Sequence, residues 1–210
     1  IRQNRVWAIP IEPIQKINPY MTITPTEFPE VLLIQTNVYQ DDRGWFMESF
    51  RRDLLEQAVG HNINFCQDNQ AKSSYGVIRG LHYQMPPAAQ SKLISVASGI
   101  ILDVVVDIRK DAPSFGKHIT VELSSESQKQ LFVPRGFAHG YACLSQTAVV
   151  SYKVDNYYNK ATEASIAFDD LQLNIDWQLP DNKIVLSEKD KSHPIFANAQ
   201  HFELNQSLYD

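Results

Sequence analysis

Turn-forming residues divide this chain into short segments, and that spacing limits the fold more than any other feature of the sequence. Between the turns lie short runs of the β-branched and aromatic residues that favour β-strands. From residue 77 onwards we expect strands at residues 77–83, 93–97, 100–108, 119–123, 130–133, 141–144 and 149–154. Parallel strands need helical crossovers, and almost no helical pattern separates these runs. The sequence therefore predicts an all-β fold, either an antiparallel sandwich or a barrel.

The first half of the chain adds further expected strands and one short helix. Residues 31–39 and 45–50 are predicted as two strands joined by a turn at residues 40–44. Another strand is expected at residues 62–69. The helix is predicted at residues 53–59, where Gly60 ends it.

Polar side chains on two of these predicted strands have two possible roles. In the strand at residues 45–50, Glu48 shares a face with Phe46 and Phe50, so it is either a binding carboxylate or part of the solvated face of an edge strand. In the strand at residues 62–69, Gln67 and Asn69 continue an apolar face. These amides either point into a pocket or bridge neighbouring strands through backbone hydrogen bonds.

Length, charge and cysteine content restrict the class of protein. A chain of 210 residues fits one domain, expected at residues 25–210, after an N-terminal extension or arm at residues 1–24. The net charge of −5 argues against a nucleic-acid partner, which needs a basic face. No apolar run is long enough for a membrane span and no signal-peptide pattern is present, so a cytoplasmic location is expected. Cys66 and Cys143 lack the spacing of a disulfide framework or a zinc site.

The chemically versatile residues concentrate at residues 76–92, GVIRGLHYQMPPAAQSK, in a predicted strand. His82 can take or give a proton near neutral pH and is a candidate base, although a lone histidine in a strand is more often a hydrogen-bonded structural residue. Strict alternation places Arg79 and His82 on opposite faces of the strand. If both contact one ligand, the strand needs a bulge, and Gly80 is the natural position for it.

Two more polar side chains are predicted to lie among apolar neighbours. Extending the alternation of the strand at residues 93–97 places Lys92 on the face of Ile94 and Val96. In the strand at residues 149–154, Tyr152 shares its face with Val150. Apolar surroundings shift pKa values, so both side chains are candidates for acid–base chemistry or charge stabilisation.

A turn at residues 134–139, PRGFAH, is expected to deliver His139 between two strands. Its P-x-G-x-x-H spacing is similar to the second motif of the cupin superfamily, small β-barrels that often bind a metal through it. The first cupin motif would supply a His-x-His pair and a glutamate, whereas this chain offers GLHYQ at residues 80–84. A three-ligand metal site is hard to assemble from these residues, and we predict a barrel without metal.

Eight motifs follow one another in order between residues 25 and 195. They are D-x-R-G-x-F-x-E at residues 41–48, Q-x-N at 67–69, GVIRGLHYQ at 76–84, KLI at 92–94, DVVVDIR at 103–109, VPRGFAHG at 133–140, SYK at 151–153 and LSEKD at 186–190. In these motifs the chain resembles the dTDP-4-dehydrorhamnose 3,5-epimerase (RmlC) family of the cupin superfamily. The resemblance implies an antiparallel double-stranded β-helix, a cupin-like jelly-roll barrel with a few short helices.

The same resemblance implies an isomerase. It would invert C3 and C5 of dTDP-4-dehydro-6-deoxy-D-glucose, giving dTDP-4-dehydro-L-rhamnose for polysaccharide biosynthesis, by removing and returning protons through an enolate. It implies no cofactor and a homodimer. Three alternatives remain open: an epimerase acting at C3 or C5 alone on another nucleotide-linked 4-keto-6-deoxy sugar, a non-catalytic sugar-binding cupin, and a metal-dependent cupin oxygenase or isomerase.

The family's motifs imply a catalytic role for four residues of this sequence. His82 would be the base that removes a proton, held by the carboxylate of Asp190. Tyr152 would be the acid that returns a proton on the opposite face of the sugar. Lys92 would stabilise the negative oxygen that forms at the sugar carbonyl.

The remaining candidate residues would bind the substrate. Asp103 and His139 would line the same pocket as the catalytic residues. The nucleotide and its diphosphate would be held by Arg43, Glu48, Gln67, Asn69, Arg79, Glu163 and Lys189, with Phe46 and Tyr158 stacking on thymine. In this family Arg43 and Glu48 can reach the neighbouring subunit's site, which is why the resemblance implies a dimer.

Overall fold

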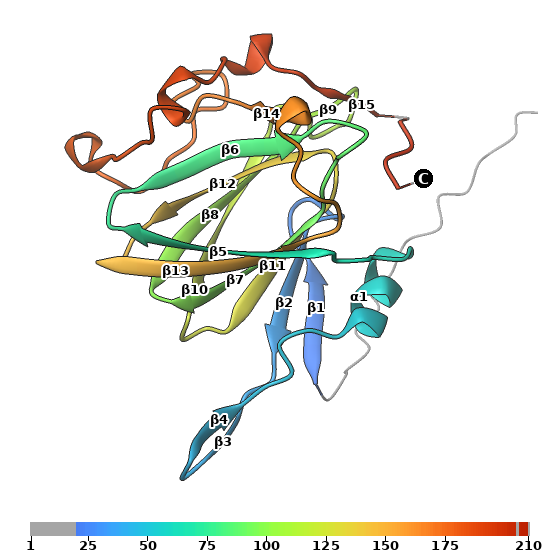
Figure 1. The fold of residues 1–210 in the computed structure, drawn as a ribbon, viewed down its shortest axis with the longest axis vertical. Coiled ribbons are helices and arrows are strands. Elements are labelled where there is room, and N and C mark those ends of the chain that lie inside the picture. Colours follow the sequence, from blue (N-terminus) through green and yellow to red (C-terminus); the bar gives the residue numbers. More distant parts are fainter. Residues whose placement is uncertain (1–19, 205, 210) are drawn as a thin grey trace, which may run out of the picture.

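The computed structural model describes residues 20–204 and 206–209, and most of its strands belong to two antiparallel sheets that enclose a common interior (Figure 1). In spatial order, the six-stranded sheet consists of β1 (Met21–Pro25), β2 (Leu32–Thr36), β11 (Lys129–Val133), β7 (Lys92–Ser98), β13 (Thr147–Val154) and β5 (Gln67–Ser74). The five-stranded sheet consists of β10 (His118–Ser124), β8 (Ile100–Asp107), β12 (Phe137–Cys143), β6 (Ile78–Gln84) and β14 (Glu163–Ser165). The antiparallel all-β prediction is confirmed.

Smaller elements extend from the two sheets. A hairpin of β3 (Tyr39–Asp41) and β4 (Gly44–Phe46) projects from the body, and β9 (Arg109–Lys110) pairs in parallel with β15 (Phe202–Glu203) (Figure 1). Helix α1 (Arg52–Val59) confirms the predicted helix, and Gly60 ends it in the left-handed conformation at φ 79°. The 3₁₀ turns are η1 (Lys160–Thr162), η2 (Asp181–Lys183), η3 (Asp190–Ser192) and η4 (Phe196–Asn198).

Apolar residues form three buried clusters, which lie between the two sheets, beneath the C-terminal segment and beneath helix α1. The interior between the sheets is filled by alternate residues of facing strands, such as Ile94 of β7 and Val105 of β8. On the opposite face of the five-stranded sheet, the C-terminal segment adds Trp177 and Phe196 to a second cluster. Helix α1 packs through Leu55 against the end of the six-stranded sheet in the third. The C-terminal segment is therefore held against β6, where His82 lies.

Two predicted strands and one predicted turn differ from the structure. Only residues 45 and 46 of the expected strand 45–50 are paired, as part of β4. Residues 62–66 of the expected strand 62–69 lie outside any strand, because β5 begins at Gln67 and continues to Ser74. His139 was expected in a turn, yet it lies inside β12, which pairs with β8 on one side and β6 on the other. The turn at this point covers only residues 134–136.

The expected N-terminal arm at residues 1–24 falls mostly outside the described residues. Its last residues, from Met21, belong to β1, which pairs with β2. Among the described residues, the helices are too short or too polar to span a lipid bilayer. Cys66 and Cys143 are both free thiols.

Candidate active site

A bulge in β6 shapes the floor of the site. His82 pairs with His139 of β12 and Arg79 pairs with Tyr141, so two residues of β6 lie opposite the single residue Gly140. Gly80 has φ +128°, and a Cβ atom there would lie 2.5 Å from the Cα atom of Gly140. Only glycine allows the two strands to approach this closely. The bulge expected at Gly80 is therefore present.

Beside this bulge lies a pocket of about 340 Å³ at one end of the space between the sheets. Its lining residues come from β5, β6, β7, β13, β14 and the loops around them, namely Gln67, Asn69, His82, Tyr83, Gln84, Gln90, Lys92, Tyr152, Tyr158 and Glu163. The structure thus brings together three of the four predicted catalytic side chains and four of the predicted substrate-binding ones. His82 and Tyr152 share one compartment.

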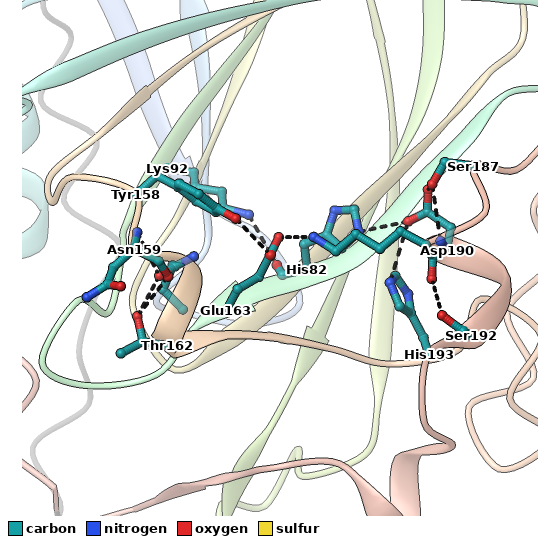
Figure 2. Close-up of polar contacts among 12 residues, drawn as sticks. His82, Lys92, Tyr158, Asn159, Thr162, Glu163, Ser187, Asp190, Ser192 and His193 are labelled. Carbon is teal, nitrogen blue, oxygen red and sulfur yellow. Dashed lines mark hydrogen bonds and ion pairs between the residues drawn. The ribbon is translucent and has the colours of Figure 1, made fainter.

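The C-terminal segment supplies the fourth catalytic candidate, Asp190 of η3. His82 Nε2 lies 2.8 Å from Asp190 Oδ1, and the hydroxyl of Ser187 donates to Asp190 Oδ2 at 2.5 Å (Figure 2). Burial alone would raise the pKa of Asp190, but the hydrogen bonds from His82 and Ser187 outweigh it and hold this pKa well below its usual range. Asp190 is therefore ionised and accepts a hydrogen bond from His82. Asp190 itself is buried, although residues 187–189, 191 and 192 around it are exposed.

Lys92 is the first residue of β7, and its side chain lies beside His82. Its Nζ donates to the backbone oxygen of His82 at 3.1 Å. Burial lowers the pKa of the Lys92 amine to about 8, although the negative charges of Asp103 and Glu163 act in the opposite direction. The amine is thus a cation at neutral pH whose charge is easily lost above it.

Tyr152 faces the same pocket from β13, opposite Ile94 in the register with β7. Burial raises the pKa of its phenol, and the guanidinium of Arg79 only partly compensates. A phenol in these surroundings keeps its proton at neutral pH and can act as a donor.

Asp103 and His139 form a buried pair behind the pocket. His139 Nε2 lies 2.9 Å and 3.0 Å from the two carboxylate oxygens of Asp103. Burial lowers the pKa of His139 despite the neighbouring carboxylate. Neither side chain is among those that line the pocket. His139 lies in β12, which pairs with the strand of His82, and Asp103 lies in β8, on the other side of β12. Arg79 also lies outside the lining and donates to Ser73 Oγ at 3.1 Å.

A network of the predicted nucleotide-binding residues surrounds the mouth of the pocket. Glu163 accepts a hydrogen bond of 2.9 Å from the Tyr158 hydroxyl (Figure 2). It also forms an ion pair with Lys189. Gln67 donates to Asn69 Oδ1 at 2.8 Å and accepts from the backbone N–H of Tyr158 at 3.2 Å. Burial would raise the pKa of Glu163, but the hydrogen bonds from Lys189 and Tyr158 lower it. The mouth therefore carries a fixed pattern of donors and acceptors beside an exposed aromatic ring.

Three predicted substrate-binding residues do not reach this chain's own pocket. Arg43 lies at the tip of the β3–β4 hairpin, with 90% of its side chain exposed, and pairs with Asp41. Phe46, at the end of β4, is 66% exposed. Glu48 follows the hairpin and contacts Arg51 at 3.2 Å. Figure 1 shows this hairpin pointing away from the sheets that hold the pocket.

Several residues of the site were not predicted from the sequence. Gln84 and Gln90 line the pocket, and Ser187 orients Asp190. His193 lies three residues after Asp190, with its ring centroid 5.2 Å from that of His82. Potential ligand atoms of His82, Asp190 and His193 lie within 4.8 Å of one another, so this cluster could hold a metal ion. Asp190 and His193 lie outside the two cupin motifs, which is where the sequence suggests metal ligands.

Comparison with known proteins gives a consistent result. The family model described as dTDP-4-dehydrorhamnose 3,5-epimerase matches residues 25–198. The dTDP-4-dehydrorhamnose 3,5-epimerase of Shigella flexneri is 46% identical over 87% of this chain and 99% of its own.

Two solved structures extend the likeness to the fold. The crystal structure of dTDP-4-dehydrorhamnose 3,5-epimerase from Elizabethkingia anophelis is 46% identical, with a TM-score of 0.82 over 85% of this chain and 98% of that one. The epimerase RmlC of Legionella pneumophila, solved in complex with dTDP-4-keto-L-rhamnose, is 40% identical, with a TM-score of 0.84 over 90% of this chain and 100% of that one. Sequence and fold therefore point to the same group of proteins.

Proposed function

The chain belongs to the dTDP-4-dehydrorhamnose 3,5-epimerase family and is an epimerase of a dTDP-linked sugar, and we propose that its His82–Asp190 pair is the base that starts the reaction. The substrate is dTDP-4-dehydro-6-deoxy-D-glucose, whose C3 and C5 flank a ketone at C4. Hydrogens on these carbons are acidic, because the carbanion left behind is an enolate. The reaction moves protons and no net electrons, so the proposal includes no redox cofactor.

The short contact between His82 and Asp190 supports the role of the base. Because Asp190 is ionised, His82 donates its Nε2 proton to the carboxylate and keeps a free lone pair on Nδ1. Removal of a substrate proton by that lone pair makes an imidazolium, which the neighbouring carboxylate stabilises. A well-placed base contributes about 10²–10⁴-fold to the rate of proton transfer.

Lys92 and Tyr152 complete the proposed mechanism from two other strands. The Lys92 ammonium stabilises the negative charge that develops on the C4 oxygen, in a partly desolvated pocket where such an interaction is strong. The Tyr152 phenol stays protonated and returns a proton to the face of the sugar opposite His82. Inversion at a carbon requires a donor on that opposite face.

The experiment that tests the base is solvent exchange. In heavy water, the wild-type protein is expected to introduce deuterium at C3 and C5 of the keto sugar nucleotide, read by NMR. His82→Asn should slow this exchange by roughly 10²–10⁴-fold, because it removes the base and leaves a side chain of similar shape. His201→Asn, a matched change at a histidine packed against Phe115 and Phe196, should exchange at the wild-type rate. Unchanged exchange in His82→Asn would exclude His82 as the base.

We also propose a homodimer in which the β3–β4 hairpin completes the partner's site. Exposed Trp45 and Phe46 on the hairpin form an apolar surface of the kind that marks protein interfaces. A second hollow of about 380 Å³, on the six-stranded sheet, shares Asn69 and Tyr152 with the catalytic pocket. A hairpin from the partner seated at this hollow would bring its own Arg43 close to the nucleotide.

The cytoplasmic location expected from the sequence stays a prediction.

A further inference from the structure

We propose that His82, Asp190 and His193 form a Zn²⁺ site and that zinc bound there inhibits the epimerase. The inhibitory part of this inference rests on the proposed role of His82 as the base. The three residues come from β6 and from the C-terminal segment that packs beside it (Figure 2).

Distances between the potential ligand atoms fit one ion after a small adjustment. His82 Nε2 lies 2.8 Å and His193 Nε2 lies 3.8 Å from the same oxygen, Asp190 Oδ1. All three ligand atoms lie within 4.8 Å of one another. A tetrahedral zinc ion has ligands at about 2.0–2.2 Å, so its ligand atoms are roughly 3.3 Å apart. Moving each of these atoms by less than about 1 Å reaches that arrangement.

His193 supplies the second, independent observation. Its side chain is only 3% exposed, and its Nε2 lies 3.8 Å from Asp190 Oδ1 with no hydrogen-bond partner among the described residues. Buried polar atoms of side chains are normally hydrogen-bonded, so a buried imidazole nitrogen that faces a carboxylate without such a bond calls for an explanation. A metal ion that approaches from Asp190 would use the unshared electron pair of His193 Nε2.

The chemistry of the three ligands favours zinc over harder cations. Two imidazoles and one carboxylate match the nitrogen and oxygen ligands that zinc takes in proteins, whereas Mg²⁺ and Ca²⁺ prefer oxygen ligands alone. His82 is 31% exposed and lines the pocket, so the ion has an entrance and can keep a water molecule as its fourth ligand.

Zinc binding would disable the base by replacing one bond with another. The Nε2–H bond of His82 breaks, its proton passes to solvent, and the nitrogen's electron pair forms the bond to zinc. Asp190 Oδ1 then binds the ion in place of that proton, and no electron is transferred. With a dication on Nε2 and no free carboxylate beside it, the His82 ring can no longer accept a proton from the substrate.

The test measures zinc binding and inhibition separately on the full-length protein. Isothermal titration with ZnCl₂ should show one site per chain in the wild type, and zinc should suppress deuterium exchange, with recovery on adding EDTA. His193→Phe keeps an aromatic ring against His82 and removes the ligand, and His193→Gln is a second variant in case the first does not fold. Both should bind zinc at least about tenfold more weakly, since even the loss of an outer partner of a metal ligand costs about 10–100-fold in affinity.

His201→Phe is the matched control, because it also removes a histidine from an aromatic cluster. It should bind zinc and be inhibited as the wild type is. Absence of a one-to-one zinc site in the wild type, or wild-type affinity in both His193 variants, would overturn the inference. A protein that binds zinc at this site but lacks exchange activity would instead refute the proposed function, so the two failures can be told apart.

Discussion

Asp190 is the residue on which the proposed base, His82, depends most. Asp190→Asn keeps the size of the side chain but cannot stabilise an imidazolium, and its amide group can also hold His82 in the wrong tautomer. We expect the exchange rate to fall by ~10²-fold or more. The measurement is the initial rate of deuterium incorporation by NMR at saturating substrate.

Glu188→Gln is a suitable control for this change, since Glu188 lies two residues away and is solvent-exposed in an ion pair with Lys191. It should retain wild-type exchange. If Asp190→Asn exchanged deuterium as fast as Glu188→Gln, the carboxylate would have no part in the base.

The lowered pKa of Lys92 predicts a loss of activity on the alkaline side. Burial lowers this pKa to about 8, so the ammonium is present below pH 8 and is lost as the pH rises through that value. Because only the cation stabilises the enolate oxygen, kcat should fall above a pH of about 8. Lys92→Met should be slow at every pH and lack this decline. A wild-type profile that stays level from pH 7 to well above the pKa would contradict the role given to Lys92.

Tyr152→Phe separates the two proton transfers. The variant keeps the ring and removes the proton donor, so the His82–Asp190 pair can still remove a substrate proton and return a deuteron to the same face. Deuterium should then enter the sugar with little inversion, whereas the wild type gives exchange and inversion together. NMR of the sugar ring reports both events in one sample. Loss of exchange and inversion in equal measure would argue against Tyr152 as the acid of the opposite face.

At the scale of elements, the contact between β6 and β12 depends on Gly80. A Cβ atom at this position would lie 2.5 Å from Gly140 Cα, whereas one at Gly44, with nearly the same φ of +127°, would meet nothing within 4 Å. Both alanine variants carry the strain of a positive φ, but only Gly80→Ala also forces the strands apart. It should lower the free energy of unfolding by roughly 1–3 kcal/mol more than Gly44→Ala, measured by urea denaturation. Equal values would show that β6 can move away from β12 without loss.

The sequence predicts a strand accurately when apolar side chains mark its buried face or faces. The predicted bounds of β7, β8 and β13 agree with the structure to within two residues, because each strand buries one or both faces in an apolar core. Strand β5, with the sequence QDNQAKSS, has almost no apolar side chains. It is a strand because it pairs with β13 along its whole length, and that partner lies far away in the sequence.

The same holds for the candidate site residues: those whose role depends on neighbouring residues could be predicted, and those positioned by distant parts of the chain could not. The bulge at Gly80 could be predicted, because two functional side chains on opposite faces conflicted within one strand. Asp190 was identified only through the family resemblance, since the loop that carries it gains its position by packing against β6. His193 was missed for the same reason, because its neighbours His82 and Asp190 meet only in the folded chain.

At the scale of the whole molecule, the predicted substrate-binding residues do not all reach the pocket of a single chain. Arg43, Phe46 and Glu48 lie on or beside a projecting hairpin, while every other group proposed to bind the nucleotide lies around or next to the pocket. In the proposed dimer, the exposed aromatic side chains of the hairpin would pack at the hollow that shares Asn69 and Tyr152 with the pocket. In a symmetric dimer each would be used twice, since such an interface is formed by the same patch on both subunits.

Mixing two inactive variants tests whether that hairpin acts in the partner's site. His82→Asn removes the base and leaves the hairpin intact, whereas Arg43→Ala leaves the base intact and removes the cation that the hairpin would deliver. In a mixed dimer, one site combines His82 of one protomer with Arg43 of the other, so random exchange of subunits should restore activity at about a quarter of all sites. Deuterium exchange before and after co-refolding an equimolar mixture measures this. If Arg43 acted within its own chain, the mixed dimer would contain no complete site beyond those already present in each variant, and activity would remain the average of the two.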